Sequence, residues 1–298
     1  MRRILIDGNH LTGRCRATLG EMTTSSGRRS GVIYGFLRGL HYLHLEHNID
    51  YPEITVCWDK GRCAKRMEIY PEYKGNRTKE NQTPEQEREF IEYMAQIKEI
   101  KVALEHVGCR QSSAQNVEAD DLVGIFSRDY ADAGESVFIY SGDHDMHQLV
   151  DDNIKILDPK QGVLGRTEVE AKWSCSIEQI PLVKAVMGDS SDNIEGVRGL
   201  GPARALFYVK NVGVDLSSVP AKEQKWVKLG RDNQAIIDRN LQLMTIPRTW
   251  ETPLYSIDHA LEAMECLVSS GYHRDETKFL EFLYAWEMNS ILENLSRW

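Results

Sequence analysis

The sequence predicts an α/β fold in which a parallel sheet is covered by helices, followed by a mainly helical C-terminal region. Three short apolar runs, at 3–7, 54–59 and 136–143, each end at an aspartate, and their length and composition are typical of buried strands. Helical patterns separate these runs, which favours a doubly wound parallel sheet. With 298 residues, of which 41% are hydrophobic, the chain is long enough for one large core or two smaller ones.

The clearest helix is expected over about 85–107, where apolar residues recur at intervals of three and four until Gly108 ends the pattern. Another helix begins near residue 118 and runs to about Tyr130. Beyond residue 215, the segments 224–229, 233–244 and 276–295 are also expected to be helical. Trp286 and Trp298 are interpreted as packing residues. We therefore expect the C-terminal part to pack against the core.

Composition and charge exclude several classes of protein. No apolar run approaches the roughly 18 to 20 residues that span a bilayer, and Asp7 interrupts the apolar start, so neither a membrane anchor nor a signal peptide is expected. The six cysteines are irregularly spaced, which predicts reduced thiols. A net charge of −9 argues against nucleic-acid binding, but the segment 60–79 carries a local basic excess.

Aspartates follow three of the predicted strands. Asp7, Asp59 and Asp143 stand directly after these strands, and Asp145 follows two residues later. Ligands of open parallel sheets bind at the carboxyl ends of the strands, so these side chains should converge there. A single aspartate after a strand is more often a helix N-cap or a turn former. Three such aspartates in one chain favour a common site.

Two further acidic groups extend this pattern. Glu118, Asp120 and Asp121 lie at the start of a predicted helix, where one carboxylate would suffice as a cap, and Asp189 and Asp192 are three residues apart. Nine carboxylates in one place are unfavourable unless cations lie among them or several pKa values rise. Ligands that are all oxygen favour Mg²⁺ or Mn²⁺ over zinc. Two such ions are the usual arrangement for phosphodiester chemistry.

A glycine-rich turn follows these last aspartates. Gly196, Gly199 and Gly201 permit a tight turn, and the next residue, a proline, suits the first position of a helix. The N–H groups of that helix N-terminus could bind a phosphate without reading sequence, with Arg198 and Arg204 as additional contacts. The alternative is an ordinary packing turn between two helices.

Together these motifs resemble the 5′ nuclease superfamily of flap endonucleases and 5′→3′ exonucleases, most closely its compact bacterial and bacteriophage members. The resemblance covers about residues 1–215 in the family's order. The matching segments are Ile6-Asp-Gly-Asn9, Trp58-Asp-Lys-Gly61, Tyr70-Pro-Glu-Tyr-Lys-Gly-Asn-Arg77, Val117-Glu-Ala-Asp-Asp121, Ser141-Gly-Asp-His-Asp145 and the run from Met187 to Pro202.

The resemblance implies a PIN-like nuclease core over 1–181, with a helical arch over about 60–84. It further implies a helical DNA-binding region over 182–298 that contains a helix–three-turn–helix element at about 182–212. By the same resemblance, the first ion would be held by Asp7, Asp59, Glu118 and Asp120. The second would be surrounded by Asp121, Asp143, Asp145, Asp189 and Asp192. A K⁺ ion on the glycine turn would be a minor ligand.

Basic and aromatic residues of the arch also match the family. Lys74 and Arg77 match positions that contact the scissile phosphate, and Tyr73 matches an aromatic side chain that can stack on a terminal base. Lys65 and Arg66 are expected to contact DNA or, alternatively, to be solvated surface residues, and the same alternative holds for Lys79.

The implied activity is metal-dependent cleavage of DNA with a 5′ flap, a 5′ overhang or a nick, together with RNase H activity on RNA:DNA hybrids. The setting would be replication or repair in the cytoplasm of a bacterial or phage-infected cell, where a monomer would work beside replication proteins. A PIN-type ribonuclease is the nearest alternative, but it would not need the glycine turn. A DNA-junction binder without activity is the other, although it would be expected to have lost carboxylates.

Overall fold

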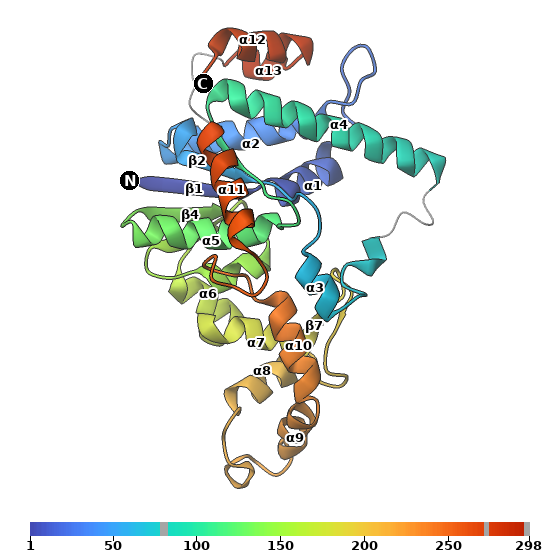
Figure 1. The fold of residues 1–298 in the computed structure, drawn as a ribbon, viewed down its shortest axis with the longest axis vertical. Coiled ribbons are helices and arrows are strands. Elements are labelled where there is room, and N and C mark those ends of the chain that lie inside the picture. The colour runs from blue at the N-terminus through green and yellow to red at the C-terminus, as the bar shows by residue number, and fades with distance from the viewer. Residues whose placement is uncertain (78–82, 271–273, 295–298) are drawn as a thin grey trace.

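The computed structural model describes residues 1–77, 83–270 and 274–294, so the predictions for Lys79, Leu295 and Trp298 lie outside the described residues. A six-stranded sheet with the order β3-β2-β1-β4-β5-β6 forms its centre, with helices on both faces (Figure 1). The strands are β1 (Arg2–Asp7), β2 (Ile54–Cys57), β3 (Arg110–Ser112), β4 (Ser136–Tyr140), β5 (Ile154–Asp158) and β6 (Gly162–Leu164).

Strand β1 is paired on both sides in the parallel sense, as predicted. Ile4 stands opposite Ile54 of β2 and Phe138 of β4. Strands β3 and β5 extend the parallel sheet on either side. The carboxyl ends of β2, β1 and β4 therefore lie next to one another at one edge of the sheet.

Strand β6 departs from the parallel prediction because it pairs antiparallel with β5. The Asp158 carboxylate accepts hydrogen bonds from the N–H groups of Lys160 and Gln161, at 2.7 and 2.9 Å, and folds the chain back. The connection between the two strands is too short for a crossover, which normally takes a dozen or more residues.

Alternate residues of β1 face the two halves of the core. Ile4 and Ile6 pack with helices α1 (Gly8–Leu19), α2 (Gly31–His47) and α4 (Pro84–Val107), whereas Leu5 packs with α5 (Ala119–Asp132) on the other face. This is the two-residue period of a strand that is buried on both sides. Figure 1 shows α2 and α4 above the sheet and α5 below it.

Helix α4 confirms the helix predicted over about 85–107. Thr83 caps its N-terminus, where Oγ1 accepts from the N–H of Gln86 at 3.2 Å and Gln86 Oε1 accepts from the N–H of Thr83 at 3.0 Å. Gly108 ends the helix with a left-handed φ of 77°. Between β2 and α4, the chain forms the short helix α3 (Ala64–Ile69).

The second half of the chain is mainly helical, as predicted. Its helices are α6 (Arg166–Trp173), α7 (Ile180–Met187), α8 (Pro202–Lys210), α9 (Gln224–Asp232), α10 (Gln234–Met244), α11 (Ile257–Ser269), α12 (Glu276–Ala285) and α13 (Asn289–Leu292). Helices α7 to α10 extend away from the sheet, whereas α12 packs on α4 and buries Trp286 (Figure 1). Residues on both sides of the predicted boundary at 181/182 share one hydrophobic cluster. The boundary itself stays a prediction.

Helix α11 covers the edge strand β3. The Ser270 hydroxyl, just after the helix, accepts from the N–H of Gln111 at 2.6 Å and donates to the carbonyl of the same residue at 2.9 Å. The Ser112 hydroxyl donates to the carbonyl of Ala263 at 2.9 Å. Both backbone polar groups of Gln111 are thereby satisfied by the C-terminal part of the chain. Across the described ranges, no helix is both long and apolar enough to cross a bilayer.

Candidate active site

Three aspartates at the carboxyl edge of the sheet accept hydrogen bonds from the backbone at the start of a helix or turn. Asp7 ends β1 and accepts a hydrogen bond from the N–H of His10 at 2.9 Å, which caps α1. Asp59 follows β2 and accepts from the N–H of Ala119 at 2.7 Å. Asp143 accepts from the N–H of Asp145 at 2.9 Å. Capping and a common site are therefore compatible, because each aspartate that caps still has a carboxylate oxygen available at the same edge of the sheet.

These carboxylates line one hollow of about 480 Å³, which we call the acidic hollow. Seven of the nine predicted carboxylates line it: Asp7, Asp59, Asp120, Asp143, Asp145, Asp189 and Asp192. Basic side chains of Arg14, Lys74 and Arg77 also line it, together with His10. Residues from β1, α1, the segment before α4, the start of α5 and the loop after α7 thus meet at one place.

Glu118 and Asp121 belong to the same cluster but do not line the hollow. One carboxylate oxygen each of Glu118, Asp120 and Asp121 lies within 4.8 Å of the others. Glu118 Oε1 accepts a hydrogen bond from Lys74 Nζ at 2.7 Å. Asp121 is fully buried, and its two oxygens are bound by the Arg66 guanidinium and by the Tyr255 hydroxyl. Both of its oxygens therefore accept hydrogen bonds from protein groups, whereas a metal ligand is expected to have an oxygen available for the ion.

Two residues that were predicted to contact DNA are buried instead. Arg66 is 2% exposed and bridges Glu118 and Asp121, so neither a DNA contact nor a solvated surface position describes it here. Tyr73 is 3% exposed, and its hydroxyl donates to Glu118 Oε2 at 2.9 Å, so its ring is not presented for stacking. Both corrections have one cause, because the buried carboxylates need hydrogen-bond donors from the neighbouring segment.

Burial and mutual repulsion raise several pKa values in the acidic hollow. Burial raises the pKa of Asp7 to about 7, and the charges of Asp59 and Asp143 add to the effect. Burial also raises the pKa of Asp59 and, together with the Asp121 charge, that of Asp120. A set of oxygen ligands that repel one another fits hard divalent cations, which would restore the charged forms.

Glu118 differs from its neighbours. Its burial would raise its pKa, but the charges of Lys74 and Arg66 outweigh that effect and lower it. The protein's own cations therefore keep this carboxylate ionised, whereas Asp120 beside it lacks such a direct ion pair in the described part of the chain. In the acidic cluster, the charge of Glu118 is thus neutralised by protein cations, whereas the charge of Asp120 is not neutralised by a direct ion pair within the described residues.

The basic segment before α4 is attached to the loop that carries Asp189 and Asp192. Arg77 Nη2 donates to Asp192 Oδ1 at 2.6 Å, and the N–H of Lys74 donates to the Asp192 carbonyl at 2.8 Å. Lys74 has a left-handed φ of 54°, which turns the chain there. Lys65, in contrast, is exposed and pairs with Glu68 on its own helix. Of the predicted arch cations, Lys74, Arg77 and the buried Arg66 therefore meet carboxylates of the acidic cluster, and Lys65 does not.

Sequence reasoning missed one buried cation. Lys184 of α7 is 7% exposed, pairs with Asp145 and lies 3.9 Å from Asp189 Oδ2. Burial lowers its pKa, against the opposing charges of Asp189 and Asp143. The signal was a single lysine within the apolar helix Ile180–Met187. Arg14 was missed as well, because nothing in the local pattern of α1 distinguishes the face that meets the hollow.

The structure places the three predicted glycines between α7 and α8, and of these only Gly199 has a positive φ. A Cβ on Gly196 would lie 2.1 Å from the carbonyl oxygen of Met187, so only glycine allows this approach, and Gly199 has a φ of 97°. Gly201 is the N-cap of α8. Arg198 is exposed, while Arg204 donates to the Gly199 carbonyl at 3.0 Å. The role of the turn in holding DNA stays a prediction.

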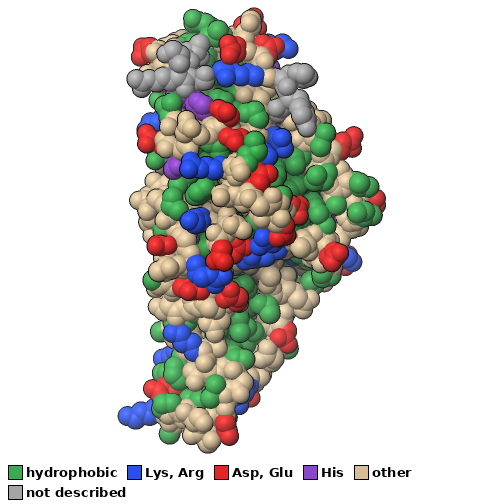
Figure 2. Space-filling view, turned by 90° about the vertical axis from the view of Figure 1, so that its left-hand side faces the viewer, with side chains coloured by type: hydrophobic (Ala, Val, Ile, Leu, Met, Phe, Trp, Pro, Cys, Tyr) green, Lys and Arg blue, Asp and Glu red, His purple; other side chains and the backbone are tan. Residues whose placement is uncertain are grey.

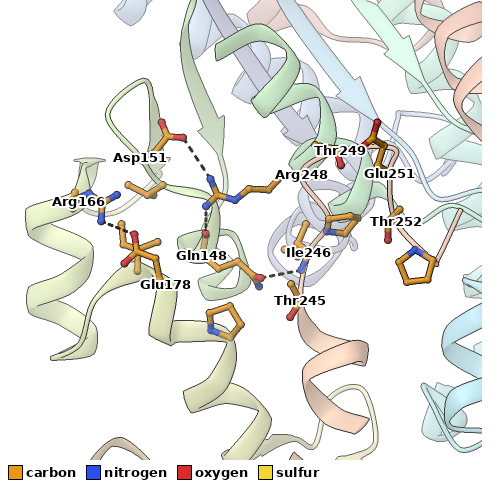
Figure 3. A pocket seen from close by; sticks show the side chains of 15 residues that line it. Gln148, Asp151, Arg166, Glu178, Thr245, Ile246, Arg248, Thr249, Glu251 and Thr252 are labelled. Carbon is orange, nitrogen blue, oxygen red and sulfur yellow. Dashed lines mark hydrogen bonds and ion pairs between the residues drawn. The ribbon is translucent and has the colours of Figure 1, made fainter. Parts of the chain in front are cut away.

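Another hollow, of about 490 Å³, lies away from the carboxylates and is shown in Figure 3. Its two arginines are ion-paired: Arg248 with Asp151 at 3.5 Å and Arg166 with Glu178 at 3.0 Å. Among the described side chains, three carboxylates line this hollow, Asp151, Glu178 and Glu251, against the seven of the acidic hollow. On the face shown in Figure 2, acidic and basic side chains are likewise intermingled.

Comparison with known proteins agrees with this site and fold. Residues 2–174 match the family model of the 5′-3′ exonuclease, N-terminal resolvase-like domain. The chain is 32% identical to a 5′-3′ exonuclease of Buchnera aphidicola over 208 residues, which are 70% of this chain and 69% of that protein. It is 30% identical to a 5′-3′ exonuclease of Aquifex aeolicus over 240 residues, which are 80% and 78% of the two chains.

A crystal structure of the T5 D15 protein, co-crystallised with metal ions, shares the fold. Its TM-score is 0.67 at 21% sequence identity, and the match covers 95% of this chain and 99% of that one. The family match covers more than half of the sequence and contains Asp7, Asp59, Asp120 and Asp143. This chain therefore belongs to the 5′-3′ exonuclease family.

Proposed function

We propose that the protein is a structure-specific 5′ nuclease that cleaves DNA at a 5′ flap, overhang or nick, using two Mg²⁺ ions for which Mn²⁺ can substitute. The observation that carries this proposal is the acidic hollow, where seven carboxylates meet three cationic side chains. The T5 D15 protein, which shares the fold, has been crystallised with metal ions, and this supports the proposal.

The donor set matches the proposed ions. Most of the carboxylates are half-buried and Asp59 is exposed, their oxygens repel one another, and the pKa of Asp7 is raised to about 7. The bound ions would supply positive charge to the scissile phosphate and activate the attacking water. Asp7, Asp59, Asp120 and Asp143 would hold them from the sheet side, and Asp145, Asp189 and Asp192 from the α7 side. We assign Asp121 to the hydrogen-bond network with Arg66 rather than to direct ligation.

The protein's own cations have a separate role in the proposal. Lys74 and Arg77 lie at the rim of the hollow, where they can stabilise negative charge that develops on the phosphate during in-line attack. Lys74 must then exchange its contact with Glu118 for the phosphate. The products would carry a 5′-phosphate and a 3′-hydroxyl group, and no covalent intermediate with the protein is required.

The glycine turn would hold the duplex. The N-terminus of α8 is exposed from Gly201 to Arg204, so the N–H groups of Gly201 and Ala203 can face a phosphate. Arg198 and Arg204 would add contacts to the same strand, and K⁺ on the turn carbonyls belongs to the same proposal. Contacts of this kind are independent of base sequence. We propose that the protein works on replication or repair intermediates in the cytoplasm as a monomer beside replication proteins, and on RNA:DNA hybrids as well.

The test is cleavage of a 5′-labelled flap duplex by the purified protein, first with Mg²⁺ and then with excess EDTA. We expect a short labelled product only with Mg²⁺. A matched single-stranded RNA is the control substrate. Cleavage of the RNA with no cleavage of the flap duplex would favour a PIN-type ribonuclease. Binding of the flap duplex without cleavage at any divalent-ion concentration would favour a junction-binding protein.

A further inference from the structure

A third hollow adjoins the acidic one. Its volume is about 460 Å³, and it lies between α1, α2 and the loops that follow β4 and β5. Arg14 of α1 lines both hollows, so the two meet at this guanidinium. We call it the arginine hollow; the lining residues used below are Arg14, Arg38, Gly39, Tyr42 and Tyr140.

The charges of the two hollows are opposite. Among the residues that the structure describes, Arg14 and Arg38 are the only charged ones that line the arginine hollow, and no carboxylate lines it. Within the described residues, neither guanidinium group has a hydrogen bond or an ion pair to another protein group. Each guanidinium carries five N–H donors in a fork that matches phosphate oxygens. Two unpaired arginines beside an acidic centre therefore form a place where an anionic group would be stabilised.

The remaining lining suits a base. The Tyr42 side chain is 51% exposed on α2, and the Tyr140 ring is half-buried at the end of β4. Leu11 and Cys15 of α1 supply a buried apolar floor. An exposed aromatic ring beside arginines is the combination on which proteins stack unpaired bases. Single exposed tyrosines are common on surfaces, so this ring alone would mean little.

Gly39 leaves the hollow open. It lies in the interior of α2, where glycine is about 1 kcal/mol less favourable than alanine. A Cβ at this position would meet no heavy atom within 4 Å. A side chain here therefore begins in open space at the lining of the hollow, which provides a direct way to fill it.

We infer that the arginine hollow binds one unpaired nucleotide of the cleaved strand, next to the scissile phosphate. Its phosphate lies on Arg14 and Arg38 and its base lies against Tyr42. Because Arg14 borders both hollows, a phosphate bound there can be the immediate neighbour of the phosphate at the carboxylates. The volume is within the usual range for a single small ligand. The inference rests on the proposed function and adds a nucleotide subsite to it.

The nucleotide can come from the 5′ or the 3′ side of the scissile phosphate, and two substrates distinguish these sources. Each is a 5′-flap duplex with one abasic residue, placed on one side or the other. Affinity is measured by fluorescence anisotropy in EDTA and as the apparent KM of cleavage with Mg²⁺. The proteins compared are the wild type, Gly39→Ala, Gly39→Leu, Tyr42→Ala and the control Tyr284→Ala, whose exposed ring lies on α12.

We expect Gly39→Leu and Tyr42→Ala to weaken binding and raise KM about tenfold, as expected for loss of one stacked base. Gly39→Ala should have a smaller effect, and Tyr284→Ala should match the wild type. One abasic substrate should weaken wild-type binding similarly, and it should cause no further loss in Gly39→Leu. The side on which this occurs identifies the bound nucleotide.

The inference would be overturned if the intact flap bound equally well to Gly39→Leu, Tyr42→Ala and Tyr284→Ala, and if the abasic residue weakened binding to all of them as it does to the wild type. Thermal denaturation excludes misfolding as the cause of a loss, because leucine in place of a helical glycine should not lower the melting temperature. If the wild type fails to cleave the flap with Mg²⁺, the proposed function is wrong. If the wild type and these variants all cleave the flap equally well, only the nucleotide subsite is wrong.

Discussion

Lys74 Nζ lies 2.7 Å from Glu118 Oε1, so the basic segment before α4 is ion-paired directly with the start of α5. The same ammonium group is 3.9 Å from Asp192 Oδ2. One side chain therefore bridges acidic residues that are 74 positions apart in the chain. Its removal should affect the acidic centre without removing any candidate metal ligand.

The first prediction concerns Lys74→Ala. We expect kcat on a flap duplex to fall about 10²-fold, because a cation that stabilises transition-state charge is lost, while the substrate affinity changes much less. Single-turnover kinetics with saturating enzyme measures this difference. Lys155→Ala, at an exposed lysine of β5, is the matched control. A purely affinity-based defect would remove Lys74 from the chemical step.

The second prediction concerns Asp143→Asn. The asparagine keeps an oxygen that can cap the following turn, so the fold should persist, but the charge needed to hold a divalent ion is lost. Cleavage should become undetectable, while binding of the flap duplex in EDTA stays within a few-fold of the wild type. Asp258→Asn, at an exposed acidic residue of α11, serves as the control. Unchanged turnover by Asp143→Asn would refute the assignment.

The third prediction concerns pH. The pKa of Asp7 is raised to about 7 from an ordinary 3.8, so its protonated form is favoured in the folded state. Without metal, the free energy of unfolding should therefore decrease as the pH rises from about 4 to 7. This one group contributes a slope of up to about 1.4 kcal/mol per pH unit. The raised pKa values of Asp59 and Asp120 act in the same direction.

Urea denaturation at pH 5, 6 and 7, in EDTA and in Mg²⁺, measures this dependence. Divalent ions should raise stability most at pH 7, where the carboxylates are ionised, and should flatten the slope. Asp7→Asn should reduce the slope in EDTA. Equal slopes with and without Mg²⁺ would contradict ion binding at these carboxylates.

The fourth prediction concerns Arg66→Met. This change leaves Asp121 buried without its guanidinium partner, and breaking a buried pair in this way typically costs about 3–5 kcal/mol. Urea denaturation measures the loss. Lys65→Met, at the exposed neighbour on the same helix, should stay within about 0.5 kcal/mol of the wild type. Replacing both partners, as Arg66→Met with Asp121→Leu, should recover much of the stability. A loss of similar size in Lys65→Met would show that α3 itself, and not the ion pair, is responsible.

Local sequence was sufficient for the features that depend on nearby residues. The strands that end at Asp7 and Asp59 have short apolar patterns, and parallel pairing of these strands then brings the carboxylates together. Helix α4 was predictable to within a residue because its periodic face is followed by Gly108. The glycine turn was predictable for the same reason, since its constraints come from the backbone within a few residues.

Contacts between distant segments were not predictable from these patterns. Arg66 lies 55 positions from Asp121, and Tyr255 lies 134 positions from it, so their pairing depends on how α3 and the segment before α11 pack. A basic residue in a basic segment has the same appearance in the sequence whether it faces DNA or a buried carboxylate. Tyr73 illustrates this for an aromatic side chain, because only the packed fold shows that its hydroxyl is directed at Glu118.

The contact between Ser270 and Gln111 has a consequence for the behaviour of shortened forms of the protein. A single hydroxyl binds both backbone polar groups of Gln111, the middle residue of an outermost strand, and it comes from beyond the matched family segment. A fragment that ends near residue 174 would leave that strand with open donors and acceptors, which are the template for intermolecular pairing. Such fragments should self-associate through this edge, while the full-length chain remains dispersed.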